Sequence, residues 1–145
     1  MAKVVEDKQS VVAPRWWNGT EGALIGLGVG FLWWLLVTIF LQYVLDTSDI
    51  ASGVAHVLVG VGALFTLIRY RVPRPLLVVL SSAIVLWSLG IYIDGLAWWE
   101  SVLWAMGFYT LSYGLFSMVA HIRNFWLSIA AAVVIVLTSV VLLSL

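Results

Sequence analysis

His56 is the residue of this chain with the clearest potential for chemistry, because it is a titratable side chain inside a long apolar run. Ionisable residues within apolar spans are costly to bury, and they mark functional sites by default. At steps of three and four residues, one helical face carries Asp49, Ser52, His56 and Gly60. An imidazole next to a carboxylate can bind a metal, relay a proton or donate a hydrogen bond to a quinone carbonyl.

A second polar stripe lies just before this face and ends at the same turn. Thr38, Gln42 and Asp46 follow one another at steps of four residues. The stripes meet across a short connector, so we expect a helical hairpin that closes around a polar notch. Either His56 and Gln42 contact a cofactor, or a neutral His56 joins the two helices by donating to Gln42, Thr38 or a backbone carbonyl. The second interpretation is favoured, since such polar contacts commonly join helices in membranes.

Trp33 and Trp34 lie near the middle of an apolar run, and Trp87 lies similarly deep in another. A buried indole N–H needs a hydrogen-bond acceptor, and hydrocarbon offers none. Packing against neighbouring helices is favoured, because aromatic residues at helical spacing usually belong to a core or an interface. The alternative is a pocket for a flat lipophilic ligand, with lipid or quinone as the candidate occupants. Its candidate contacts are Trp33, Trp34, Gln42 and His56.

Several other chemistries lack the residues they need. The chain has no cysteine, which excludes disulfides, Cys-ligated zinc, iron–sulfur clusters and haem attached through Cys-x-x-Cys-His. A haem held by two histidines fails on geometry, since His56 and His121 fall at opposite depths of the expected bundle. No Ser/His/Asp set, phosphate-cradling loop or nucleic-acid surface is recognisable, and the net charge is zero. We therefore predict no catalytic residue, no metal site and no nucleic-acid partner.

The composition indicates that lipid surrounds most of the chain. Hydrophobic residues make up 63% of the sequence and charged residues only 10%, whereas about a quarter of residues are charged in soluble domains. A membrane-spanning helix needs about 20 apolar residues. We predict an all-α transmembrane bundle at residues 22–145, preceded by a cytoplasmic arm at residues 1–21. The five expected helices are Gly22–Leu45, Ile50–Tyr70, Pro75–Ile93, Trp98–Ala120 and Phe125–Leu145.

The charges predict how this bundle is oriented. All seven Lys and Arg residues fall on the side of the N-terminus, in the arm or near the second and fourth connectors. The first and third connectors and the residues beside them carry only acids: Asp46, Asp49, Asp94 and Glu100. Because positive charge is retained on the cytoplasmic side, we expect the N-terminus inside and the C-terminus outside. The predicted location is the cell membrane, with the lipid bilayer as the immediate partner.

Small residues predict where helices approach one another closely. The first expected helix opens with Gly22, Gly26 and Gly30 at intervals of four, which form a groove on one face. Helix 98–120 carries a seam of small and polar residues that includes Gly107 and Gly114. An internal contact of the glycine groove with helix 50–70 or 98–120 is favoured, and an oligomer or partner contact is the alternative.

These features favour a non-enzymatic accessory or structural subunit that packs with itself or with other integral membrane subunits. The alternative is a subunit of a redox complex that binds a lipophilic cofactor, namely a quinone, a carotenoid or haem. A small transporter or channel component is a third interpretation. It is disfavoured because no expected helix carries Asp, Glu, Lys or Arg near its middle, where ion-coupled transport usually needs a charge.

Overall fold

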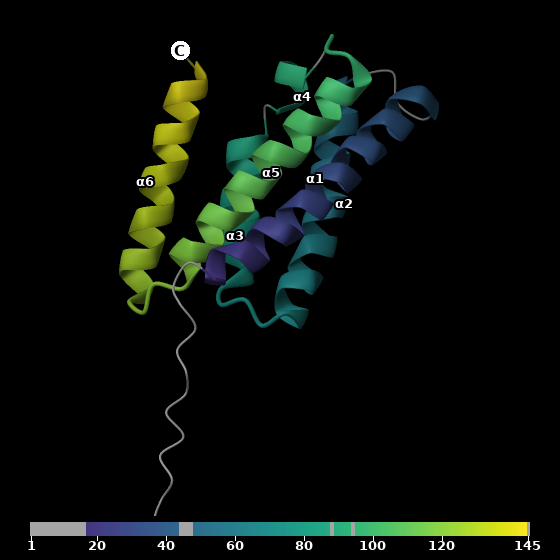
Figure 1. Cartoon of the computed structure of the whole chain (residues 1–145). Coiled ribbons are helices and arrows are strands. Elements are labelled where there is room, and N and C mark those ends of the chain that lie inside the picture. Colours follow the sequence, from purple (N-terminus) through teal and green to yellow (C-terminus); the bar gives the residue numbers. More distant parts are fainter. Residues whose placement is uncertain (1–16, 44–47, 88, 94, 145) are drawn as a thin grey trace, which may run out of the picture.

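The computed structural model describes residues 17–43, 48–87, 89–93 and 95–144, and the regular structure in these ranges is helical (Figure 1). The helices are α1 (Trp17–Tyr43), α2 (Ser48–Arg69), α3 (Pro75–Leu86), α4 (Leu89–Ile93), α5 (Trp98–Ala120) and α6 (Phe125–Ser144). Five of them are 12 to 27 residues long, and α4 has five residues. The predicted all-α fold class is confirmed.

Four of the described helices are long and apolar enough to cross a membrane, which supports a membrane protein. The apolar stretches are Gly19–Phe40, Ile50–Arg69, Trp98–Ala120 and Phe125–Leu142. They overlap four of the five expected spans. The number of spans, their orientation and the role of the arm stay predictions, and residues 1–16 lie outside the described part.

The third expected span, residues 75–93, is not one continuous helix. The helix divides into α3, which has 12 residues, and α4, which has five. At 1.5 Å per residue α3 is about 18 Å long, which is short of the roughly 30 Å of a bilayer core. Trp87 closes α3 with a tightened turn, its N–H bonded to the carbonyl of Ile84. Gly90, a weak helix former at the start of α4, follows this break closely, and the apolarity of the segment concealed its signal.

Glycine residues let α1 and α5 cross in close contact, and these two helices form the most extensive pairing of the bundle. A Cβ atom placed on Gly22, Gly26 or Gly30 would lie 2.4, 2.4 or 2.7 Å from atoms of Ser117, Tyr109 or Ala105 respectively. Real Cβ atoms essentially never come closer than 3.0 Å to a neighbouring heavy atom. Only glycine fits these three positions in this arrangement, and the groove that they form faces inward.

The two predicted glycines of α5 differ in position. Gly114 is buried, and a Cβ atom there would lie 3.2 Å from the Cβ of Ala23 in α1. Gly107 is exposed and would have no atom within 4 Å of such a Cβ. Its placement in the packing seam is therefore corrected. The buried face of α5 instead runs through Ala105, Tyr109, Ser112, Tyr113, Phe116, Ser117 and Ala120.

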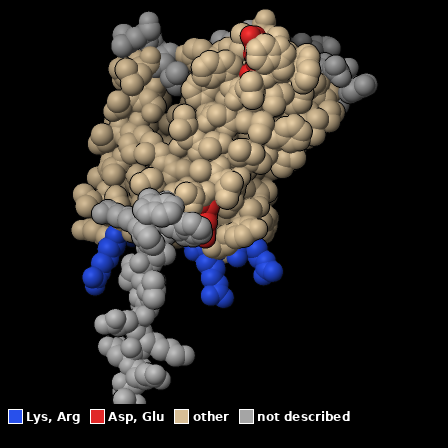
Figure 2. Space-filling view, viewed as in Figure 1, with Lys and Arg blue, Asp and Glu red and all other residues tan. Residues whose placement is uncertain are grey.

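Charged side chains gather at the ends of the bundle, and its flank is almost free of them (Figure 2). The described arginines, Arg69, Arg71, Arg74 and Arg123, lie at one end, which we name the arginine end. Glu21 lies near that end and shares a surface hollow with Tyr70. Glu100 lies in the first turn of α5, toward the opposite end. The five expected helices require this separation of charged residues, whichever side faces the cytoplasm.

At the arginine end, Arg74 connects the turn before α3 with the turn between α5 and α6. Its guanidinium donates hydrogen bonds to the carbonyls of Ala120 at 3.3 Å, Ile122 at 2.8 Å and Arg123 at 3.4 Å. It also lies over the Phe125 ring, 5.4 Å from the centroid. The carbonyls at the end of a helix lack helical partners, and a positive charge is favourable there. Arg74 therefore stabilises the turn between α5 and α6 from the start of α3.

Helix α6 is attached mainly at its first half. The hydroxyl of Ser128 donates to the carbonyl of Val119 in α5 at 2.9 Å, and Ala132 is buried one turn later. Leu137 and Leu142 are exposed, and α6 diverges from α5 toward the C-terminus (Figure 1). The helix thus offers a long apolar surface that the rest of the chain does not cover.

The glycine contact gives a matched pair of variants on one helix. Gly26→Ala should lower the free energy of unfolding by about 1–3 kcal/mol, the usual cost of overpacking, because its Cβ would meet the Tyr109 backbone carbonyl. Gly28→Ala, which has nothing within 4 Å, should be neutral or stabilising by up to about 1 kcal/mol through helix propensity. Thermal unfolding in mild detergent, followed by circular dichroism, measures both. Equal stability of the two variants would contradict the described crossing.

Candidate functional site

A hydrogen bond between Trp33 and His56 joins α1 to α2 inside the bundle. The indole Nε1 of Trp33 donates to the imidazole Nδ1 of His56 at 2.9 Å. Trp33 is fully buried, and His56 is only 5% exposed. The ring centroids lie 5.0 Å apart at an interplanar angle of 63°, so the rings meet edge to face. The acceptor that a deep tryptophan requires is thus the candidate histidine itself.

The role of His56 Nδ1 depends on the tautomer of the ring. Nδ1 lies 2.9 Å from Trp33 Nε1 and 2.8 Å from the carbonyl oxygen of Ser52. When the indole N–H donates to Nδ1, the imidazole proton sits on Nε2. With the proton on Nδ1, the ring donates to the Ser52 carbonyl instead. The Trp33–His56 bond therefore belongs to the Nε2 tautomer, whose Nε2 has no partner among the described residues.

Four helices converge around this pair. Tyr109 of α5 has its ring centroid 5.8 Å from that of Trp33 and 6.1 Å from that of His56. Trp87, at the end of α3, lies 6.0 Å from His56 although its indole is mostly exposed. The carbonyl of Leu86, where α3 ends, also interacts with the imidazole. His56 therefore lies beside the break in the third helical segment.

Several buried polar atoms have no hydrogen-bond partner among the described residues. They are Ser52 Oγ, His56 Nε2, Ser82 Oγ, Tyr109 OH and Ser112 Oγ. A neutral imidazole and a nearby phenol can hold helices together through hydrogen bonds and ring contacts. No buried charge lies among the described residues to bias a proton between them.

The structure brings together only part of the predicted site. Trp33 and His56 are in contact, whereas Trp34 is half-buried beside Phe31, with ring centroids 6.3 Å apart. The hydroxyl of Thr38 donates to the carbonyl of Trp34 in its own helix rather than to His56. The side chain of Gln42 lies outside the described residues, as do those of Asp46 and Asp49. The polar notch of the hairpin therefore remains a prediction.

Tyr109 belongs to the site and was missed from the sequence. The signal was a run at steps of four residues, Ala105, Tyr109, Tyr113 and Ser117. The small and polar residues instead predict a seam through Gly107 and Gly114, which leaves the two tyrosines out. The buried residues of α5 show that small residues and tyrosines share one side of this helix.

No metal cluster is found in the described ranges, where no three His, Cys, Asp or Glu side chains gather. His121 lies at the arginine end of α5, where its Nδ1 is 2.7 Å from the carbonyl of Ser117. The fold and the site together define an apolar helical bundle, compatible with a multi-pass membrane protein, whose interior is joined by neutral polar groups. No protein-family model, curated protein or solved structure matches the chain.

The Trp33–His56 bond predicts a specific pattern of coupled stability losses. His56→Gln should be nearly silent, because the amide oxygen can accept from Trp33. His56→Leu should cost about 1 kcal/mol, and so should Trp33→Phe beyond its loss of packing. In the double variant His56→Leu/Trp33→Phe, the total loss of stability should be smaller than the sum of the two single losses. The difference should be about 0.6–1.7 kcal/mol, the range for interhelical bonds in membranes.

Unfolding of the four variants by denaturing detergent, followed by tryptophan fluorescence and circular dichroism, measures this coupling. Strictly additive losses would show that the two side chains act independently, which would exclude the hydrogen bond as an interhelical link. A loss in His56→Gln as large as in His56→Leu would also contradict it.

Proposed function

We propose that this protein is a non-enzymatic, multi-pass membrane protein that acts as an accessory or structural subunit of a larger membrane assembly. The observation that carries the proposal is the apolar surface of α6. Of its 18-residue apolar stretch, only 11% is buried. A partner helix that covers this surface would complete the packing that the chain itself leaves open.

The neutral interior supports a structural role. The buried polar side chains among the described residues are seven serines and His56. Such groups form interhelical hydrogen bonds and need no counter-charge. An ion-coupled transporter usually places an ionisable residue near the middle of the membrane, and the described arginines and glutamates lie toward the ends instead. A transporter or channel is therefore less well supported.

The inward glycine groove limits which surface can meet a partner. Gly22, Gly26 and Gly30 contact α5, so they are not free to pack against a second copy. Larger apolar side chains make up much of the surface that stays open to other subunits. On α6 these are presented along one side by Val134, Leu137 and Val141, which are 56–61% exposed. The proposal accordingly assigns partner contact to α6 rather than to α1.

Because the chain has no cysteine, each single-cysteine variant carries one label at a chosen position, and the cysteine-free wild type shows the background from other membrane proteins. Val134→Cys, Leu137→Cys and Val141→Cys, labelled with benzophenone maleimide in native membranes, should cross-link to another polypeptide upon illumination. The buried Ala132→Cys and the exposed α1 variants Leu24→Cys and Phe31→Cys are the controls, and they should give little or no product. Gel electrophoresis and mass spectrometry identify the products. Equal cross-linking from α1 and α6, or none from α6, would contradict the proposal.

A further inference from the structure

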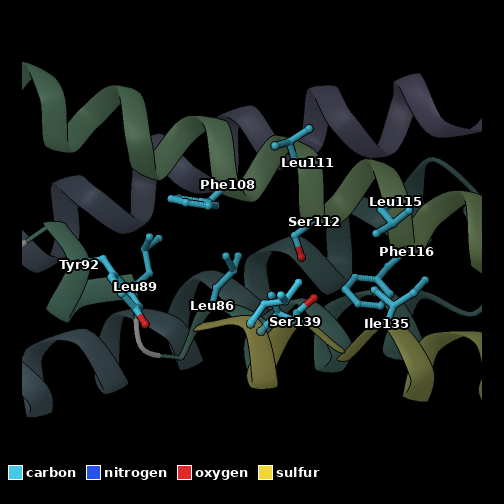
Figure 3. A pocket seen from close by; sticks show the side chains of 12 residues that line it. Leu86, Leu89, Tyr92, Phe108, Leu111, Ser112, Leu115, Phe116, Ile135 and Ser139 are labelled. Carbon is cyan, nitrogen blue, oxygen red and sulfur yellow. The ribbon is translucent and has the colours of Figure 1, made fainter. Parts of the chain in front are cut away.

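A cavity of about 280 Å³ lies between α3, α4, α5 and α6 (Figure 3). Its wall is apolar, with Leu86 and Leu89 on one side, Phe108 and Leu115 on another and Ile135 on a third. This volume is just below the range of about 300–1,000 Å³ typical of small-molecule pockets. It exists because the chain breaks its helix between α3 and α4 and because α6 diverges from its neighbours, which leaves the space between these helices unfilled.

Two serine hydroxyls give this apolar cavity a polar feature. Ser112 of α5 and Ser139 of α6 both line it, and their oxygens point into it in the close view (Figure 3). Ser112 is 7% exposed, and its hydroxyl is one of the buried groups without a partner in the described part. An unpaired buried hydroxyl costs about 1–3 kcal/mol. A ligand that brings an acceptor oxygen to Ser112 would recover that loss.

The cavity opens sideways, toward the surface that lipid would cover. Leu111 and Leu142, at its rim, are 71% and 67% exposed. Ser112 lies eight residues before the end of α5, which is about 12 Å along the helix. The headgroup oxygens of a phospholipid stay at the membrane surface and do not reach that depth. An oxygen that bonds to Ser112 therefore belongs to a molecule dissolved in the hydrocarbon core.

We propose that this cavity binds a membrane-soluble molecule that combines an apolar tail with a carbonyl oxygen, as an alkyl-substituted benzoquinone does. One ring fits the enclosed space, its carbonyl accepts a hydrogen bond from Ser112, and the tail leaves through the open side into lipid. Haem does not suit the cavity, because its lining includes no charged side chain to hold the propionates. The occupant lies away from the Trp33–His56 pair that the sequence had suggested.

A photoreactive benzoquinone with a ten-carbon tail tests this proposal on the full-length chain in phosphatidylcholine nanodiscs. Labelling should be saturable, map to α5 and α6, and be displaced by the same quinone without the photoreactive group. Ser139→Leu, which fills the cavity, should raise the half-saturating quinone content of the bilayer at least about tenfold. Ser112→Ala should raise it about fivefold, the scale of one hydrogen bond.

Two matched variants control for general damage. Thr138→Leu is the neighbour of Ser139 but is exposed, and its hydroxyl bonds within α6. Ser82→Ala removes another buried, unpaired hydroxyl that does not line the cavity. Both should label as the wild type does. Non-saturable labelling, or the same labelling in all variants, would overturn the proposal. Weakening by Ser139→Leu without any effect of Ser112→Ala would overturn it too, because the cavity would then hold a plain alkyl chain.

Discussion

The close crossing of α1 and α5 is the constraint on which the rest of this structure depends. Lipid supplies no hydrophobic force between helices, so close van der Waals contact and polar groups must hold them together. Gly22, Gly26 and Gly30 remove the side chains that would separate the two backbones. The same face of α1 continues into Trp33, which lies beside Tyr109. The glycine contact therefore sets the depth and orientation at which the indole meets His56 on α2.

The polar groups buried among the described residues are uncharged, which suits an apolar surrounding where buried charge is costly. Ser128 connects α6 to α5, and Trp33 connects α1 to α2, each through one neutral hydrogen bond. In the described part of the chain, charged side chains lie toward the ends, where Arg74 holds the turn between α5 and α6. Stability then comes from many small contacts. The less packed region, around the broken third segment and the second half of α6, is where a cavity and a free surface arise.

Much of the fold could be predicted from the sequence, because apolar length and turn residues are local properties. The boundaries of α5 match those of the expected helix. The boundaries of α6 agree with its expected helix to within one residue. The interruption of the third segment was not predicted, since Gly90 is a weak signal inside a strongly apolar run. Gly107 and Gly114 look alike in sequence, yet only Gly114 faces α1, because the face of a helix that is buried depends on its neighbours.

The site was predictable in part for the same reason. A deep tryptophan and a buried histidine each require a partner, and the structure pairs Trp33 with His56. The sequence does not contain the distances between helices, so it could not show that Trp34 lies elsewhere or that Tyr109 joins the pair. The cavity beside Ser112 arises from the divergence of α6, which no local pattern encodes.

One disulfide measures the central crossing directly. The Cβ of Ala23 would lie 3.2 Å from a Cβ at Gly114, close to the roughly 3.5–4.5 Å that a disulfide spans. In the otherwise cysteine-free chain, the pair Ala23→Cys/Gly114→Cys should form an intramolecular bond on mild oxidation in the membrane. The product would be a monomer of altered mobility on non-reducing gels. A disulfide-linked dimer, or no bond at all, would contradict the account, because α1 would then not pack against α5 of the same chain.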